Sequence, residues 1–337
     1  MIMNFKRENN KIIFKVDLKY VGKIVSTKID NNQFIPVCLV NLNGEVIIEE
    51  SIFNKFKNNL YIENTYLRVN KNIKKYSLSF GINKYPNPAN NLKGCVNDAI
   101  NWRNILRDKV GFDSVLFLDS EANSKNFSNS IIELSQKCIP DDIFVLTYSG
   151  HGSSVIDTHN DELDGRDECI CLYDKFFIDD EIKSLFDKFQ KGVRICFISD
   201  SCHSGTVTRA FNNQNIIKEN LYKKARYLPP EDDNIALSIS KLPLIGKMKN
   251  IIIEDDMIDI LIAGCKDTEY SYDAIIDGIP CGAFSYYAQK VIKESIIEKL
   301  TYEEFYNSLK KYLPSNTYNQ TPQLEGKEDN KKRIIFS

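Results

Sequence analysis

Two short glycine-flanked segments of this sequence carry residues suited to nucleophilic chemistry. His151 lies in YSGHGS, and Cys202 lies in DSCHSG. Only the thiolate form of cysteine is a strong nucleophile, so a reactive cysteine needs a nearby base such as imidazole. The neighbouring glycines permit tight turns with free backbone N–H groups, which can stabilise a developing negative charge. The pattern therefore suggests a Cys–His pair that performs covalent catalysis.

The elements before these two residues should bring them together. Residues 142–148 (DIFVLTY) and 193–198 (VRICFI) are apolar runs, typical of strands buried on both faces of a parallel sheet. His151 and Cys202 follow these runs directly, so both are expected at the carboxyl edge of one sheet, where sites form in open α/β folds. A lone cysteine after a strand can also be a small buried residue, and the residues alone leave that alternative open.

Other histidines and cysteines offer competing assignments. His203 is adjacent to Cys202, so its side chain is expected to point elsewhere, and His159 lies in a polar acidic loop where it should be solvated. Cys169 and Cys171 form C-x-C, whereas zinc sites prefer C-x₂₋₄-C, and no second pair follows. His151 is therefore the favoured base, and a zinc site is not favoured.

The hydrophobic pattern of the chain changes near residue 74. Beyond it, apolar runs predict strands that alternate with helical patterns; the strands are 75–80, 114–118, 142–148, 193–198 and 257–263, and the helices are 97–109, 127–138, 182–189, 283–293 and 301–312. Alternation of this kind predicts an α/β fold with a central, mostly parallel sheet and helices on both faces. Residues 206–256 are less regular, which is typical of a functional or disordered connection.

Residues 1–73 have a different pattern. Apolar and charged side chains alternate over 14–20, and an apolar run at 34–40 precedes Asn43-Gly44, a hairpin signal before residues 46–48. Residues 52–60 place apolar side chains on one helical face. This stretch is therefore predicted to form a small strand-rich accessory domain, followed by the larger domain at 74–337.

Composition excludes several classes of protein. The 337 residues contain 44 Lys and Arg against 46 Asp and Glu, a balance that argues against bulk nucleic-acid affinity. Only residues 1–75 are basic, with 13 Lys and Arg against 7 Asp and Glu, and no phosphate-binding motif supports a nucleic-acid or nucleotide sensor. No apolar run reaches about 18 residues, so no membrane span is expected. The start lacks a signal-peptide pattern, and nine scattered cysteines do not suggest a disulfide scaffold, so a cytoplasmic protein is expected.

Residues 74 to about 326 resemble the caspase-like cysteine peptidases, and most closely the metacaspases and their bacterial relatives. The matching stretches occur in family order and are YSLSFGINKYPNPANNLKGCVNDA (76–99), FVLTYSGHGS (144–153), DELDGRDECICLYD (161–174), CFISDSCHSG (196–205), DILIAGCKDTEYSYDA (259–274) and QTPQLEG (320–326). The interval from His to Cys is also the roughly 50 residues typical of caspases, although DSC replaces their Q-A-C signature. The resemblance implies a caspase-like fold and a cysteine endopeptidase acting on proteins or peptides.

By this resemblance, Cys202 is the nucleophile and His151 the general acid and base, with the amides of Gly152 and Cys202 as the oxyanion hole. The family lines its S1 pocket with two carboxylates, which correspond here to Asp98 and Asp200, together with Cys95 and Ser149. Such a pocket accepts Arg or Lys through charge-assisted bonds and rejects Asp by like charge. Cleavage after Arg or Lys is therefore expected.

The resemblance also suggests a calcium site. Asp167, Asp179 and Asp180 match family ligands in an acidic segment, and carboxylate oxygens suit Ca²⁺. The fourth carboxylate expected in the family is Arg209 here, and an acidic segment of this kind can also be plain solvated surface.

Family members are cut between a large and a small portion, which correspond here to 74–205 and 257–337. The linker 206–256 holds basic residues that an Arg/Lys-specific enzyme could cut, so self-cleavage is a hypothesis beside an ordinary basic loop; the candidates are Lys223, Lys224, Arg226, Lys247 and Lys249. The alternative to an active enzyme is a catalytically silent caspase-fold protein that binds partners. Retention of both Cys202 and His151 argues against it, while residues 1–73 could dock a regulatory partner.

Overall fold

The structure, a computed structural model, describes residues 5–15, 24–28, 34–40, 45–56, 60–62, 65–67, 73–156, 166–202, 222–229, 260–266 and 269–337. The chain forms two compact units, Met1–Ile73 and Lys74–Ser337.

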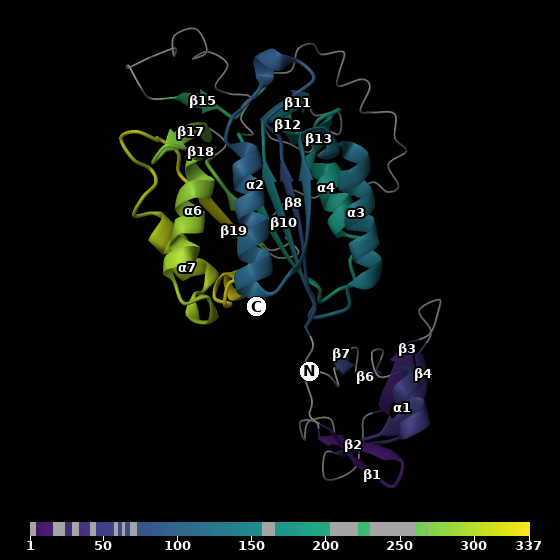
Figure 1. The fold of residues 1–337 in the computed structure, drawn as a ribbon. Helices are drawn as coiled ribbons and strands as arrows, with labels where there is room; N and C mark the ends of the chain where they lie inside the picture. Colours follow the sequence, from purple (N-terminus) through teal and green to yellow (C-terminus); the bar gives the residue numbers. More distant parts are fainter. Residues whose placement is uncertain are drawn as a thin grey trace. The chain divides into compact units, whose positions relative to one another are not determined.

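The second unit is built on one six-stranded sheet (Figure 1). Its strands, in spatial order, are β9 (Asp113–Leu118), β8 (Lys75–Gly81), β10 (Ile143–Ser149), β14 (Arg194–Asp200), β16 (Ile260–Ala263) and β19 (Gln323–Gly326). The first five run parallel, and β19 pairs antiparallel with β16. The prediction of a mostly parallel sheet is confirmed.

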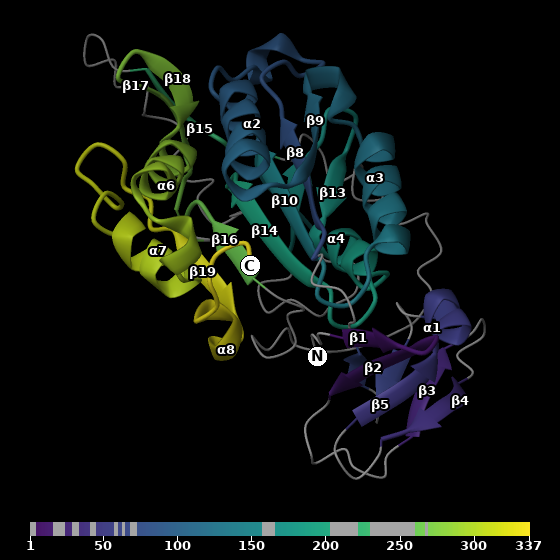
Figure 2. The same cartoon turned by 60° about the horizontal axis from the view of Figure 1, so that its bottom comes forward.

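Helices cover both faces of this sheet, as predicted (Figures 1 and 2). One face carries α2 (Cys95–Asn104, extended by a π-helical turn at Ile105–Lys109), α6 (Ala283–Glu294) and α7 (Tyr302–Leu309). The other carries α3 (Ser124–Lys137) and α4 (Asp179–Phe186), whose apolar side chains join one core with Leu78, Phe80, Phe144 and Leu146. Asn123 caps α3 by accepting a hydrogen bond from the Asn126 amide, which fixes where that helix begins.

Helix boundaries differ from the predictions by a few residues. The predicted helix 97–109 already begins at Cys95, and the predicted helix 182–189 begins at Asp179, where three acidic residues occupy the first turn. Negative side chains are favoured at that end of a helix because of its dipole. Shorter helical turns are formed by Pro88–Asn90, Asp119–Glu121, Ile297–Lys299 and α8 (Glu328–Lys331).

Two small sheets were not predicted. One consists of β11 (Gly152–Ile156), β12 (Arg166–Cys171) and β13 (Phe176–Ile178), and it continues the chain directly after His151. The other consists of β15 (Lys223–Ala225), β17 (Tyr272–Ile276) and β18 (Ile279–Gly282). Strand β15 lies inside the predicted linker, so at least this part of the linker is regular structure.

The first unit is strand-rich, as predicted. Its two sheets have the orders β1-β2-β5 and β4-β3-β6-β7, and its strands and helix are β1 (Phe5–Glu8), β2 (Lys11–Lys15), β3 (Ile24–Lys28), β4 (Phe34–Leu39), β5 (Glu45–Glu49), α1 (Glu50–Phe56), β6 (Leu60–Ile62) and β7 (Thr65–Leu67). The expected hairpin of residues 34–40 with 46–48 is reduced to a single antiparallel bridge between Val40 and Val46, because β4 otherwise pairs with β3 and β5 with β2. Leu60, expected on a helix, begins β6 instead.

Among the described residues, no helix is both long and apolar enough to cross a membrane.

Candidate active site

The ends of β10 and β14 place His151 and Cys202 side by side. The two strands are neighbours in the sheet, and Ser149 lies opposite Asp200 in their register. His151 and Cys202 each follow two residues later, and both side chains are completely buried. The predicted placement at the carboxyl edge of one sheet is therefore what the structure shows.

Two backbone amides at this edge point to one oxygen atom. The N–H groups of Gly152 and Cys202 both donate to the carbonyl oxygen of Arg226, at N–O distances of 2.9 and 3.2 Å. A Cβ atom on Gly152 would lie 1.9 Å from the Cys202 carbonyl oxygen, so only glycine allows this close approach. Two convergent donors of this kind can stabilise an oxyanion.

The imidazole of His151 is oriented by a backbone carbonyl. Its Nε2 lies 2.7 Å from the carbonyl oxygen of Asn90, at the end of the helical turn Pro88–Asn90. A carbonyl only accepts, so Nε2 carries the hydrogen and Nδ1 carries the lone pair. Nδ1 is buried and has no hydrogen-bond partner among the described residues. Burial lowers the pKa of His151 from 6.5 to about 3, which keeps the ring neutral in this closed state.

The thiol of Cys202 is engaged with the backbone at the start of β17. Its Sγ accepts a hydrogen bond from the Ser271 amide at 2.8 Å and lies 3.3 Å from the Ser271 carbonyl oxygen. The Tyr227 side chain, which follows Arg226 in the chain, packs against Cys202 and Cys265.

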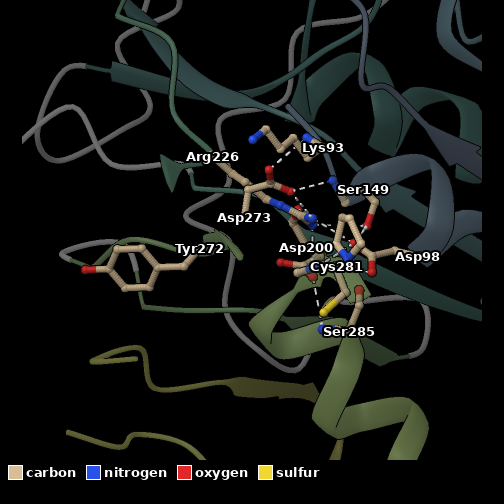
Figure 3. Close-up of polar contacts among 12 residues, drawn as sticks. Lys93, Asp98, Ser149, Asp200, Arg226, Tyr272, Asp273, Cys281 and Ser285 are labelled. Atoms are coloured by element: carbon tan, nitrogen blue, oxygen red, sulfur yellow. Dashed lines mark hydrogen bonds and ion pairs between the residues drawn. The ribbon is translucent and has the colours of Figure 1, made fainter. Parts of the chain in front are cut away.

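Three carboxylates surround the guanidinium of Arg226 (Figure 3). Its terminal nitrogens lie 2.7 Å from Asp98, 3.0 Å from Asp200 and 3.1 Å from Asp273, and Nη1 also donates to Ser149 Oγ at 3.2 Å. All five side chains are at most 1% exposed. Asp98, Ser149 and Asp200 were predicted together as pocket residues, and the structure brings them together.

Backbone amides hold these carboxylates in place. Asp98 accepts from the Gly282 amide at 2.9 Å, and Asp200 accepts from the Ser285 amide, at the start of α6, at 3.0 Å. Asp273 accepts from the amides of Lys93 and Gly94, just before α2, at 2.8 and 2.9 Å.

The pocket holds more negative than positive charge. Burial raises the pKa of Asp98 to about 7, although Arg226 opposes this shift, and Asp200 adds to it. Cys95 is fully buried beside the same charges. Burial raises the pKa of its thiol, so Cys95 contributes a neutral side chain to the pocket wall. The carboxylates in the pocket thus favour a cationic guest.

Gly282 shapes the floor of this pocket. A Cβ atom there would lie 2.1 Å from an Asp200 oxygen and 2.5 Å from Nη1 of Arg226. A side chain at this position would therefore displace the guanidinium.

The segment that carries Arg226 lies in the site as an extended strand. Residues Lys223–Ala225 pair antiparallel with β17, and the Arg226 amide donates to the Ser271 carbonyl at 2.9 Å. Beyond Arg226, the Leu228 amide donates to the Gly152 carbonyl at 2.9 Å. The chain is therefore held by backbone bonds on both sides of the Arg226 carbonyl, as expected for a peptide bound by strand addition.

The other predicted self-cleavage residues that the structure describes do not enter the acidic pocket. Lys223 and Lys224 direct their amines to other parts of the surface, and Lys247 and Lys249 lie outside the described residues. His159 and His203 also lie outside them.

The predicted calcium residues lie on β12 and at the start of α4. Asp167 is buried on β12, and Asp179 and Asp180 begin α4. Among the described residues, no group of three His, Cys, Asp or Glu side chains is arranged to hold a metal ion, and this includes Cys169 and Cys171. The calcium site stays a prediction.

Several site residues were missed from the sequence. Asp273 lies within the stretch YSYDA, which resembles the metacaspases, and that position was the only signal in the sequence for its role. Asn90 acts through its backbone carbonyl and Gly282 through its lack of a side chain, so their residue types give no comparable signal.

Comparison with known proteins finds one recurring family. The family model described as "Metacaspase, peptidase C14 domain" matches residues 75–210. Metacaspase-1 of Schizosaccharomyces pombe is 29% identical over 287 residues, covering 74% of this chain and 67% of the relative. Metacaspase-1 of Meyerozyma guilliermondii is 30% identical over 307 residues, covering 81% and 74%. A crystal structure of a Geobacter sulfurreducens protein superposes with a TM-score of 0.61 at 29% identity, covering 78% of this chain and 98% of that one.

Proposed function

Because the chain belongs to the metacaspases, a family of cysteine-type peptidases, we propose that it cleaves proteins after arginine or lysine through Cys202 and His151. The observation that carries this proposal is the position of Arg226. Its side chain fills an acidic pocket while its carbonyl oxygen meets the amides of Gly152 and Cys202. An arginine substrate residue would need the same two sets of contacts.

The chemistry follows from these positions. The Cys202 thiol gives its proton to Nδ1 of His151, and the thiolate adds to the substrate carbonyl carbon. The amides of Gly152 and Cys202 stabilise the resulting oxyanion, and loss of one such donor typically costs about 2.7–4 kcal/mol. The imidazolium then protonates the leaving amine as the C–N bond breaks, which leaves a thioester on Cys202.

Water completes the cycle. His151 takes a proton from the water molecule, the hydroxide adds to the thioester carbonyl, and the C–S bond breaks to give a carboxylic acid. The sulfur leaves as a thiolate and recovers the proton from His151. Asn90 supports both half-reactions, because its carbonyl keeps the hydrogen on Nε2 and the lone pair on Nδ1.

Specificity for a basic residue follows from the buried charges. Three carboxylates and the Ser149 hydroxyl can surround a guanidinium, whereas an aspartate side chain would meet only like charge and unpaired acceptors. Arginine should be preferred over lysine, because its fork reaches separate carboxylates with separate nitrogens.

We further propose that the intact chain inhibits itself and is cut at the Arg226–Tyr227 bond. Arg226 occupies the pocket that an external arginine would need, and its carbonyl is the one held by the two amides. In this state the Cys202 thiol is bonded to Ser271, so a rotation of the thiol towards the carbonyl carbon must precede attack. Cutting frees the segment and opens the cleft.

The proposed setting is the reducing cytoplasm. All nine cysteines are free, and eight of them are buried. Residues 1–73 have their own hydrophobic core around Ile12, Phe14 and Val46, and a regulatory partner for them stays a prediction.

The test is a comparison of fluorogenic peptides that differ only in the residue before the bond. Arginine and lysine peptides should be cleaved and the aspartate peptide should not, and Cys202→Ala should abolish the activity. Cleavage after aspartate would overturn the proposed specificity, and a folded chain that cuts neither itself nor any of the peptides would support the catalytically silent alternative.

A further inference from the structure

A second cation is bound beside the acidic pocket, on the opposite face of the same strand. In β15, Ala225 lies opposite Tyr272 of β17. Side chains alternate along a strand, so Lys223 lies on the same face as Ala225 and close to the Tyr272 ring. Figure 3 shows this ring pointing away from the carboxylates, so it lines a separate site.

The amine of Lys223 is held by two aromatic rings and a carbonyl. Its Nζ lies 3.7 Å from the centroid of the Tyr272 ring and 5.8 Å from that of Tyr318, and it donates to the Thr317 carbonyl oxygen at 2.7 Å. A cation within about 6 Å of an aromatic face is attracted by the negative potential of that face. Burial lowers the pKa of Lys223, because the amine is partly desolvated.

Hydrogen bonds that do not involve Lys223 hold Tyr318 and the Tyr272 backbone in place. Tyr318 is 4% exposed, and Ser315 bonds both its amide and its carbonyl. Gln320, which is fully buried, accepts from the Tyr272 amide at 3.2 Å and donates to the Gly264 carbonyl at 2.8 Å. The two rings lie 6.4 Å apart and are inclined by 45°.

We propose that Tyr272, Tyr318 and the Thr317 carbonyl form a substrate subsite for a cationic side chain, three residues before the arginine at which the chain is cut. This inference rests on the proposed function, because it assumes that a substrate binds in the same position as β15. The subsite selects Lys or Arg through ring faces and a carbonyl, so its chemistry differs from that of the carboxylate pocket. Preferred substrates thus have the form (Lys/Arg)-x-x-Arg.

The first test uses two peptides, acetyl-Lys-Lys-Ala-Arg-coumarin and the same peptide with norleucine as its first residue. Norleucine keeps the apolar stem and removes only the amine. The lysine peptide should have a kcat/KM about tenfold higher, as expected for one cation–π contact and one hydrogen bond. Tyr272→Leu should bring the ratio of the two peptides close to one, and Tyr272→Phe, which keeps a ring, should retain most of it.

Equal rates on the two peptides, or a ratio that Tyr272→Leu leaves unchanged, would overturn the subsite. Failure to cleave either peptide would speak against the proposed peptidase activity, and a second measurement then decides on the subsite alone. In the uncut Cys202→Ala chain, amide hydrogen exchange of residues 223–225 reports how tightly β15 is held.

Lys223→Met and Tyr272→Leu should each raise that exchange about tenfold, and the double variant should be little faster than either single one. This non-additivity is expected when two residues share one interaction. Unchanged exchange in Lys223→Met, or fully additive effects, would show that the amine makes no stabilising contact there.

Discussion

The carbonyl oxygen of Arg226 accepts a hydrogen bond from the backbone amide of Cys202 at 3.2 Å. The residue proposed as nucleophile therefore already holds the carbonyl group that it would attack. Arg226 is anchored at its other end by three buried carboxylates, so both ends of one residue are bound as a substrate would be.

The carboxylates should determine the preference for basic residues. Asp98→Asn, Asp200→Asn and Asp273→Asn should each lower kcat/KM for arginine peptides by about 30-fold or more, since losing one partner of a buried charge pair costs at least about 2 kcal/mol. Peptide kinetics on purified variants check this. Asp108→Asn, at an exposed site, is the matched control. An unchanged kcat/KM in Asp273→Asn would remove the third carboxylate from the pocket.

A single methyl group at Gly282 should block the pocket. The backbone there has φ −77° and ψ 138°, which alanine adopts without strain, so the effect of Gly282→Ala is purely steric. Its Cβ would lie 2.1 Å from Asp200 and 2.5 Å from the guanidinium. Self-cutting and arginine-peptide cleavage should both fall more than about 100-fold, while circular dichroism shows a folded chain. Normal arginine cleavage by Gly282→Ala would place the substrate side chain elsewhere.

Arg226→Gln should separate cutting from activity. The variant should stay intact at position 226, because glutamine cannot satisfy the carboxylates. Its vacated pocket should admit external arginine peptides at once, with an initial rate at least about tenfold above that of the uncut parent, because a tethered competitor acts at an effective concentration near millimolar. Initial-rate assays check this, with Lys188→Gln as a control. An uncut and silent Arg226→Gln chain would mean that occupancy of the pocket is not what restrains the enzyme.

His151 should make the closed chain sensitive to acid. Its folded-state pKa is about 3, against 6.5 ordinarily, so the unfolded state binds the proton first as pH falls. The contribution of the neutral His151 ring to the free energy of unfolding is present above pH 6.5 and is lost progressively between pH 6.5 and 3. From pH 7 to pH 4, the Cys202→Ala chain should lose about 3 kcal/mol more unfolding free energy than Cys202→Ala with His151→Gln. Urea unfolding at the two pH values measures this, and equal losses would contradict the burial of a neutral imidazole.

The sequence predicted the sheet edge and the residues of the acidic pocket better than it predicted the Arg226 segment that occupies the pocket. Apolar strands at 142–148 and 193–198 predicted the sheet edge, because fully buried strands have a simple apolar pattern. The resemblance to metacaspases then supplied Asp98, Ser149 and Asp200. The role of Asn90 depends on a backbone carbonyl, which residue type does not reveal.

The linker shows a different limit of sequence reasoning. Five basic residues there had the right charge, but charge alone does not say which carbonyl reaches two amides. Only Arg226, among the candidates that the structure describes, combines the acidic pocket with the amides of Gly152 and Cys202. Asp273 was missed for a similar reason, because its carboxylate reaches the pocket from a strand of the small portion.

The most direct test of self-cutting by Cys202 is the identity of the bond that the chain cuts in itself. Purified wild-type and Cys202→Ala chains are incubated in parallel, and the new N-terminus of any fragment is determined by mass spectrometry. A fragment beginning at Tyr227 should appear in the wild type and none in Cys202→Ala. Cutting only at other bonds, or equal cutting at Arg226–Tyr227 without the Cys202 thiol, would contradict it.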